Sequence, residues 1–260
     1  MAARPGGPVS TRGSTPVVHL GRSEVVDRGY AVLAAVDLGR DAANLYDAAS
    51  SRAQAAAPAI ERLRGALLAH PGDALVLQGW PLRAATLATL AAPPVAPALA
   101  TAWAGAVATH GSPASDPPER VTAAFDRLPA LLAALWAPLG PAAPGTCRVL
   151  DCPPLGRHGR ALAHGDAFVV ATSASAGLGW HPLMQVFHEA AHPVTDAPVL
   201  ARLGSGAAAA RRTAAGSAGF EVHRALESTA VAYGTTVIEG HAPDLLPAWQ
   251  AWCRDWVYSG

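Results

Sequence analysis

Apolar residues in the first part of the chain recur at helical spacing. Val26, Tyr30 and Leu33 are spaced i, i+4 and i+7, and Ser23 precedes them as a suitable N-cap. This pattern predicts a helix that begins after Ser23 and ends near Gly39. A second helix is predicted to start at or just before a proline, to carry three apolar positions on one face and to end at a His-Pro-Gly sequence: Pro58, Ile60, Leu63, Leu67 and residues 70–72.

The region after this second helix is rich in Ala and Leu and is punctuated by proline. Trp80-Pro81 and Pro93-Pro94 are expected to divide residues 73–108 into short helices. The composition of residues 110–118 predicts a loop, and a further helix is predicted from Glu119 to about Trp136.

Residues 140–145, Gly-Pro-Ala-Ala-Pro-Gly, are the best candidate for a boundary within the chain. We therefore expect a disordered tail at 1–16, a helical half at 17–140 and a second half at 141–260. The two halves are compatible with a single domain.

The hydrophobic period changes after this boundary. Residues 147–151 are predicted to form a strand, and residues 160–164 and 167–172 a hairpin with a turn at Gly165-Asp166. A long helix follows from about Ala218 to Val237, and a last helix carries an aromatic stripe interpreted as packing surface: Trp249, Trp252 and Trp256. The predicted fold class is α+β, mostly helical, with a small antiparallel sheet.

Composition and charge narrow the classes of protein. Hydrophobic residues make up 51% of the 260 residues, enough for a substantial core. The formal net charge is zero, so nothing in the charge balance favours nucleic acid or an anionic membrane as a partner. Residues 1–16 lack the apolar core of a signal peptide, and no apolar run reaches membrane length. The odd set Cys147, Cys152 and Cys253 argues against a disulfide framework, so we expect a cytoplasmic protein.

The strongest chemical signal is the sequence HEAAH at residues 188–192. On a helix, His188 and His192 lie one turn apart on one face, and Glu189 lies beside them. Two imidazoles at this spacing can share one zinc ion, and the Glu can take a proton from a water on the metal. The apolar residues around the motif have helical spacing, and Pro193 is expected to end the helix.

The long helix after the motif offers the third ligand. Glu227 lies in a mostly apolar stripe, where a carboxylate is costly unless it is paired or bound to metal. Glu221 is the alternative, but it is turned about 120° away from Glu227 and has Arg224 as an ion-pair partner. Glu227 is therefore the preferred ligand, with Glu221 as the second choice.

An HExxH helix followed by a helix that supplies a Glu resembles the gluzincin branch of the zincin metallopeptidases. The sequence ESTA from Glu227 is similar to the Glu-x-x-Ala with which that branch presents its ligand, and the closest likeness is to uncharacterised bacterial members. The resemblance implies Zn²⁺ as cofactor, Glu189 as general base and acid, and a peptide or protein as substrate. It also implies an edge strand that pairs with the substrate, which we assign to Ala167–Thr172.

The competing interpretation is a helical binding or scaffold protein whose HExxH is fortuitous or holds a metal without turnover. Three further residues are candidates for supporting roles. His223 could orient a ligand or stabilise an oxyanion, Asp196 could accept a hydrogen bond from a metal-bound histidine, and Tyr233 could donate to a tetrahedral intermediate. Each also has a purely structural interpretation. Four other histidines are expected on the surface: His158, His164, His181 and His241.

Overall fold

The computed structural model describes residues 15–36, 57–110, 125–156, 158–173, 180–207 and 217–256. The predictions for Gly39, for the loop at 111–118, for the helix start at Glu119 and for most of the N-terminal tail lie outside these residues. The strands are β1 (Val17–Gly21), β2 (Thr146–Asp151), β3 (Gly159–His164) and β4 (Ala167–Thr172). The helices are α1 (Glu24–Ala35), α2 (Pro58–Ala69), α3 (Ala74–Arg83), α4 (Leu87–Leu90), α5 (Pro97–Thr109), α7 (Leu128–Trp136), α8 (His181–Leu203), α10 (Ser217–His241) and α11 (Leu246–Trp256).

The fold is α+β and mostly helical, as the sequence predicts. The four strands form one sheet in the order β1-β2-β4-β3. Only β3 and β4 are antiparallel, and they form the predicted hairpin, with Gly165 in the turn at a φ of 58°. The pairs β1–β2 and β2–β4 are parallel. The prediction of an antiparallel sheet is therefore wrong: the sheet is mixed, because β2 pairs in parallel with both β1 and β4.

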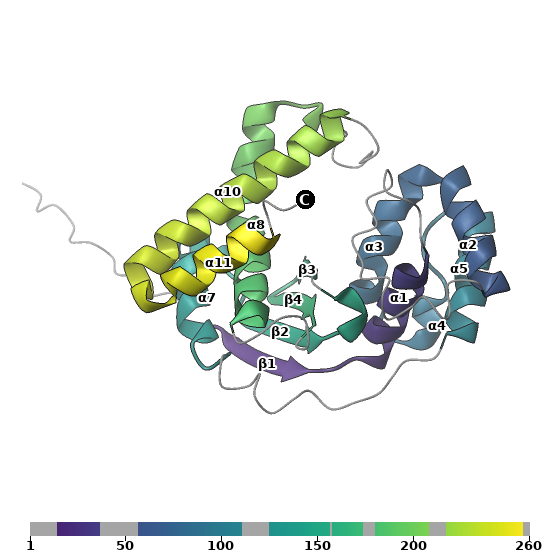
Figure 1. Cartoon of the computed structure of the whole chain (residues 1–260), viewed down its shortest axis with the longest axis horizontal. Coiled ribbons are helices and arrows are strands. Elements are labelled where there is room, and N and C mark those ends of the chain that lie inside the picture. Colours follow the sequence, from purple (N-terminus) through teal and green to yellow (C-terminus); the bar gives the residue numbers. More distant parts are fainter. Residues whose placement is uncertain are drawn as a thin grey trace, which may run out of the picture.

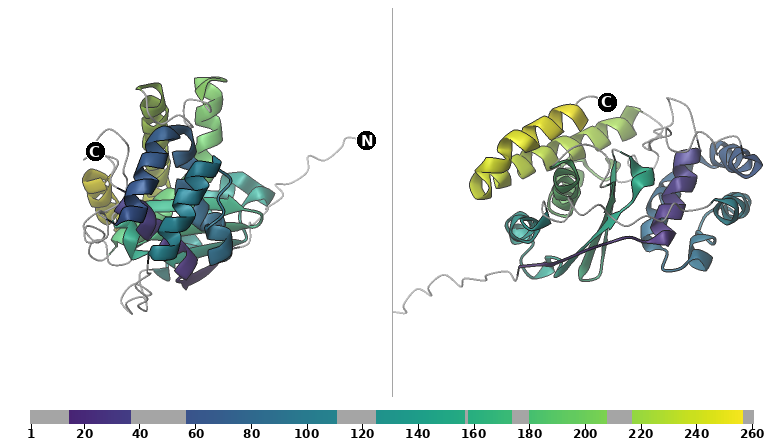
Figure 2. Two further views of the ribbon diagram at one scale, coloured as in Figure 1. Left: turned by 90° about the vertical axis from the view of Figure 1, so that its right-hand side faces the viewer. Right: turned by 60° about the horizontal axis from the view of Figure 1, so that its bottom comes forward.

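Two groups of helices flank this sheet (Figure 1). Helices α7, α8, α10 and α11 share one hydrophobic core with Cys147, Val149, Phe168 and Val170. Helices α1, α2, α3 and α5 share another with Leu150, Val169 and Ala171, which alternate with the first set along β2 and β4. The two central strands, β2 and β4, thus bury residues on both of their faces, as expected where helices cover both sides of a sheet, whereas the outer strands β1 and β3 are more exposed. The right-hand view in Figure 2 shows the same separation of the helices.

Most of the predicted helices in the first half are found. The Ser23 side chain accepts a hydrogen bond from the Val26 amide at the start of α1, and Pro58 is the first residue of α2. Pro93 and Pro94 separate α4 from α5. Trp80-Pro81 does not divide the chain, because α3 continues through Pro81 to Arg83. Trp80 instead links α3 to the end of α4, since its indole donates a hydrogen bond to the Leu90 carbonyl at 3.0 Å.

The carboxyl ends of the three parallel strands, β1, β2 and β4, lie at the same end of the sheet. Gly21 pairs with Leu150, and Asp151 pairs with Thr172, which in turn pairs with Gly159 at the start of β3. Within the described residues, no helix is both long enough and apolar enough to cross a membrane.

Candidate metal centre

The HExxH sequence lies in the first half of α8, as predicted. The helix does not end at Pro193; it continues through Pro193 and Pro198 to Leu203. A proline inside a helix removes a backbone hydrogen bond and disfavours the preceding turn. Here α8 packs along α10, and the indole of Trp136 on α7 donates to the Ala190 carbonyl at 2.8 Å. This packing outweighs the local preference, so the second histidine lies in mid-helix.

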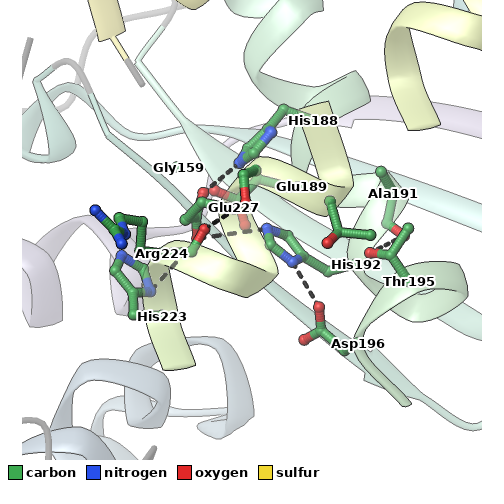
Figure 3. Close-up of polar contacts among 12 residues, drawn as sticks. Gly159, His188, Glu189, Ala191, His192, Thr195, Asp196, His223, Arg224 and Glu227 are labelled. Carbon is green, nitrogen blue, oxygen red and sulfur yellow. Dashed lines mark hydrogen bonds and ion pairs between the residues drawn. The ribbon is translucent and has the colours of Figure 1, made fainter. Parts of the chain in front are cut away.

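Three side chains from α8 and α10 converge on one point (Figure 3). One ligand atom from each of His188, His192 and Glu227 lies within 4.8 Å of the others. The Glu227 carboxylate is 2.8 Å from Nε2 of His188 and 3.7 Å from Nε2 of His192. Two ligand atoms on one tetrahedral zinc ion are about 3.4 Å apart, given metal–ligand bonds of about 2.1 Å. The two separations, to Oε2 and Oε1 of Glu227 respectively, are close to that value, so this His-His-Glu group could hold a metal ion.

Asp196 fixes the second histidine. Its carboxylate accepts a hydrogen bond from Nδ1 of His192 at 2.8 Å. A proton held on Nδ1 leaves the lone pair of Nε2 for a metal, and carboxylates are common partners of metal-binding histidines for this reason. Of the two roles considered for Asp196, the geometry fits an orienting acceptor.

The charges of the group stabilise one another. Burial by itself lowers the pKa of His192, but the hydrogen bond to Asp196 and the charges of Glu227 and Glu189 outweigh burial and raise the pKa to about 9. Burial alone would raise the pKa of Glu227. The hydrogen bond to His188 and the charges of His188, His192 and His223 instead lower it to about 2. Glu227 is therefore held as a carboxylate, the form that binds metal.

Glu189 lies beside the group and is not one of its ligands. Its carboxylate accepts a hydrogen bond from Nε2 of Gln185, one turn earlier on α8, at 3.0 Å. It is partly exposed, whereas His188 is buried. A carboxylate in this position can reach a molecule that enters from solvent.

The other candidate residues, His223, Glu221 and Tyr233, lie beside the His-His-Glu group or away from it. Nδ1 of His223 lies 3.5 Å from the Glu227 carboxylate, but its side chain is 57% exposed and contacts the outer side of the group. The Glu221 side chain is 59% exposed and pairs with Arg224 at 2.9 Å, away from the histidines. The hydroxyl of Tyr233 donates to the Leu135 carbonyl on α7 at 2.6 Å, so Tyr233 is not brought to the group.

His181 and Trp252 make contacts that the sequence did not predict. His181 is buried, not on the surface, because the start of α8 lies against α11. Trp252 is a core residue, as predicted for the aromatic stripe, but its ring also lies 5.1 Å from the ring of His188. Sequence reasoning missed this contact, and it missed Gln185. Gln185 could have been found from its spacing, because it lies four positions before Glu189 on the same helix.

The strand Ala167–Thr172 is not the edge strand. It is β4, between β2 and β3, so both of its edges are paired and the prediction that it binds substrate is wrong. The edge strands are β1 and β3, and the first residue of β3, Gly159, lies against Gln185 and Glu189. The hairpin was assigned correctly, but β2 pairs with its second strand because parallel pairing with β4 buries Phe168 and Val170.

The chain was also compared with known proteins. No protein-family model, no curated protein and no solved structure matches it.

Proposed function

We propose that this protein is a zinc-dependent peptidase, with His188, His192 and Glu227 as ligands and Glu189 as general base and acid. The observation that carries the proposal is the convergence of these three ligands from two helices, with a carboxylate of the same motif beside them. A His₂Glu set is a donor set that zinc enzymes use, and it leaves a coordination position for water or substrate.

The chemistry follows from the arrangement of the protein groups. A zinc ion bound by three such ligands acidifies a water and polarises a carbonyl group. Glu189, partly exposed and bound on one oxygen by Gln185, accepts the proton of the attacking water. The same carboxyl group then passes that proton to the leaving amine of the cleaved peptide bond. Asp196 holds the proton on Nδ1 of His192, so the proton that His192 would release on binding a metal is the one on Nε2.

The peptide is expected to bind along β3. This strand is an edge of the sheet and begins at Gly159, next to Glu189. An extended peptide can add to such an edge through main-chain hydrogen bonds, which would fix its backbone near the metal. The buried free thiols of Cys147, Cys152 and Cys253 favour a reducing compartment, so we place the protein in the cytoplasm.

Metal content and hydrolysis test the proposal together. Protein purified without added metal should contain about one zinc per chain, and His188→Ala should lose it, whereas His241→Ala, at an exposed position, should not. A library of fluorescence-quenched peptides should be cleaved by the wild type. Glu189→Gln should retain zinc and lose nearly all cleavage, and the exposed control Glu239→Gln should match the wild type.

Each outcome distinguishes the proposal from its competitor. Bound zinc without cleavage of any library member would indicate a binding or scaffold protein with a metal site. Absence of zinc from the wild type would indicate a fortuitous HExxH. Cleavage by Glu189→Gln within a few-fold of wild type would remove Glu189 from the mechanism.

A further inference from the structure

The amide of Gln185 is buried next to the proposed general base. Gln185 is 5% exposed, and its Nε2 donates to Oε1 of Glu189 at 3.0 Å. Burying an amide is costly unless it is hydrogen-bonded, and a hydrogen bond to a carboxylate is stronger than one between neutral groups. The bond therefore gives this buried amide a partner and holds the Glu189 side chain in one orientation.

Gly159, at the start of the edge strand β3, lies against the side chains of Gln185 and Glu189. A Cβ atom at Gly159 would lie 2.5 Å from Nε2 of Gln185 and 2.8 Å from Oε1 of Glu189. The backbone of Gly159 does not have a positive φ, so space and not conformation requires glycine here. The two nearest atoms that a methyl group would meet are the donor and the acceptor of the hydrogen bond, and the third is Cγ of Gln185 at 2.9 Å. The bond thus depends on residues from two different elements.

We infer that Gln185 is a positioning residue for Glu189, and that Gly159 provides the space in which the two side chains meet. This inference rests on the proposed function, because it concerns the general base of that reaction. Within the part of the chain that the structure describes, the Gln185 amide is the hydrogen-bond donor to this carboxylate. It occupies Oε1 and leaves Oε2 for the attacking water. A general base must lie within hydrogen-bond reach of the proton that it removes, so fixing one oxygen places the other.

Gln185 and Gly159 can be perturbed separately. Gln185→Met keeps the length and burial of the side chain and removes the donor. Gly159→Ala keeps the donor and displaces it, and the first contacts are with the ends of two flexible side chains, so the fold should adapt. The matched controls are Gln250→Met, at an exposed position on α11, and Gly21→Ala, where an added Cβ meets no atom within 4 Å.

The experiment measures zinc content, kcat and KM on a quenched peptide that the wild type cleaves. Both variants should retain zinc, because neither residue is a ligand. Their kcat should fall by about 10- to 100-fold with KM unchanged, as expected when a reacting group is misplaced by about 1 Å. Both controls should match the wild type.

Three outcomes would overturn the inference. If the wild type cleaves the peptide and both variants have a kcat within twofold of it, Gln185 does not position Glu189, and the proposed function stands. If Gln185→Met loses zinc in parallel with kcat, the role of Gln185 is to support the metal-binding fold. If the wild type cleaves no peptide, the proposed function fails first and this inference fails with it. A Gly159→Ala chain that does not fold leaves Gln185→Met to decide.

Discussion

Nδ1 of His192 and the carboxylate of Asp196 are 2.8 Å apart across a turn of α8 that contains Pro193. This contact exists because the helix does not stop at the proline. If α8 ended after His192, Asp196 would not be one helical turn away on the same face. The orientation of the second histidine therefore depends on the packing that carries α8 past Pro193.

We predict that Asp196→Ala weakens zinc binding by about 10- to 100-fold, the usual effect of removing the partner of a metal-binding histidine. Asp196→Asn should have a smaller effect, because its side-chain oxygen can still accept the hydrogen bond. Zinc titration against a chelator of known affinity measures this. Asp244→Ala is the control, since Asp244 pairs with Arg127 on the surface. Equal affinity in wild type and Asp196→Ala would contradict the prediction.

The third ligand can be decided by a pair of substitutions on α10. Glu227→Ala should lose most of the zinc affinity, because it removes one of the three proposed ligands. Glu221→Ala should bind zinc like the wild type, because Glu221 pairs with Arg224 in solvent. Isothermal titration with Zn²⁺ at one pH compares the two variants. The opposite ranking would show that the other face of α10 binds the metal.

Trp252 should report metal binding. Its ring centroid lies 5.1 Å from that of His188, and it stacks on Trp249 at 5.2 Å. Co²⁺ can occupy zinc sites, and its partly filled d shell quenches a nearby indole. Titration with Co²⁺ should quench the fluorescence of the wild type, and Trp252→Phe should lose most of that quenching. Trp249→Phe should retain it, because the Trp249 indole donates to Thr235 and is one ring further away. Full quenching in Trp252→Phe would place the metal elsewhere.

Asp27 should make the fold less stable as pH rises. Its side chain is 3% exposed, and burial raises the pKa of its carboxyl from 3.8 to about 6. The hydrogen bond with Cys152 and the charge of Arg22 lower this pKa, whereas the charge of Asp151 raises it further. Because the folded pKa lies above the unfolded one, the contribution is fully present below about pH 4 and is lost as pH rises through about 6. A difference of about 2 pKa units corresponds to about 3 kcal/mol.

The measurement is the free energy of unfolding by urea at pH 4 and at pH 7.5. Wild type should lose about 2 kcal/mol more than Asp27→Asn over this interval, because part of the effect is already lost at pH 4. Asp126→Asn, at an exposed position, should follow the wild type. Identical pH dependence in wild type and Asp27→Asn would show that this carboxyl ionises freely in the fold.

The part of the candidate metal centre that lies on α8 could be predicted from sequence because it depends on local helix geometry. His188, His192 and Asp196 are successive i, i+4 positions, and the choice of Glu227 over Glu221 needed only the angle between them and their neighbours. In the structure, these three residues of α8 lie together with Glu227, and Glu221 lies in solvent. Helix geometry is sufficient for the contacts within α8, whereas the approach of Glu227 to the two histidines depends on the packing of α10 against α8.

Contacts between distant segments could not be predicted in this way. The pairing of β1 with β2, the burial of His181 against α11 and the approach of Gly159 to Glu189 all depend on how elements pack in space. Pro193 shows the same limit, since a strong local signal for a helix end was overridden by α7 and α10. Tertiary packing commonly decides against local propensity where the two conflict.

The pairing of β1 with β2 also has a consequence for the order of folding. Arg22, just after β1, binds Asp151 at the end of β2, and 129 positions of sequence separate the two. As the chain is synthesised, β1 leaves the ribosome long before its partner, whereas the α1–α5 region that lies between them can begin to assemble from local contacts. The two ends of a long loop must then be brought together to complete the sheet. The sheet therefore cannot be completed until Asp151 has been synthesised, 129 positions after Arg22.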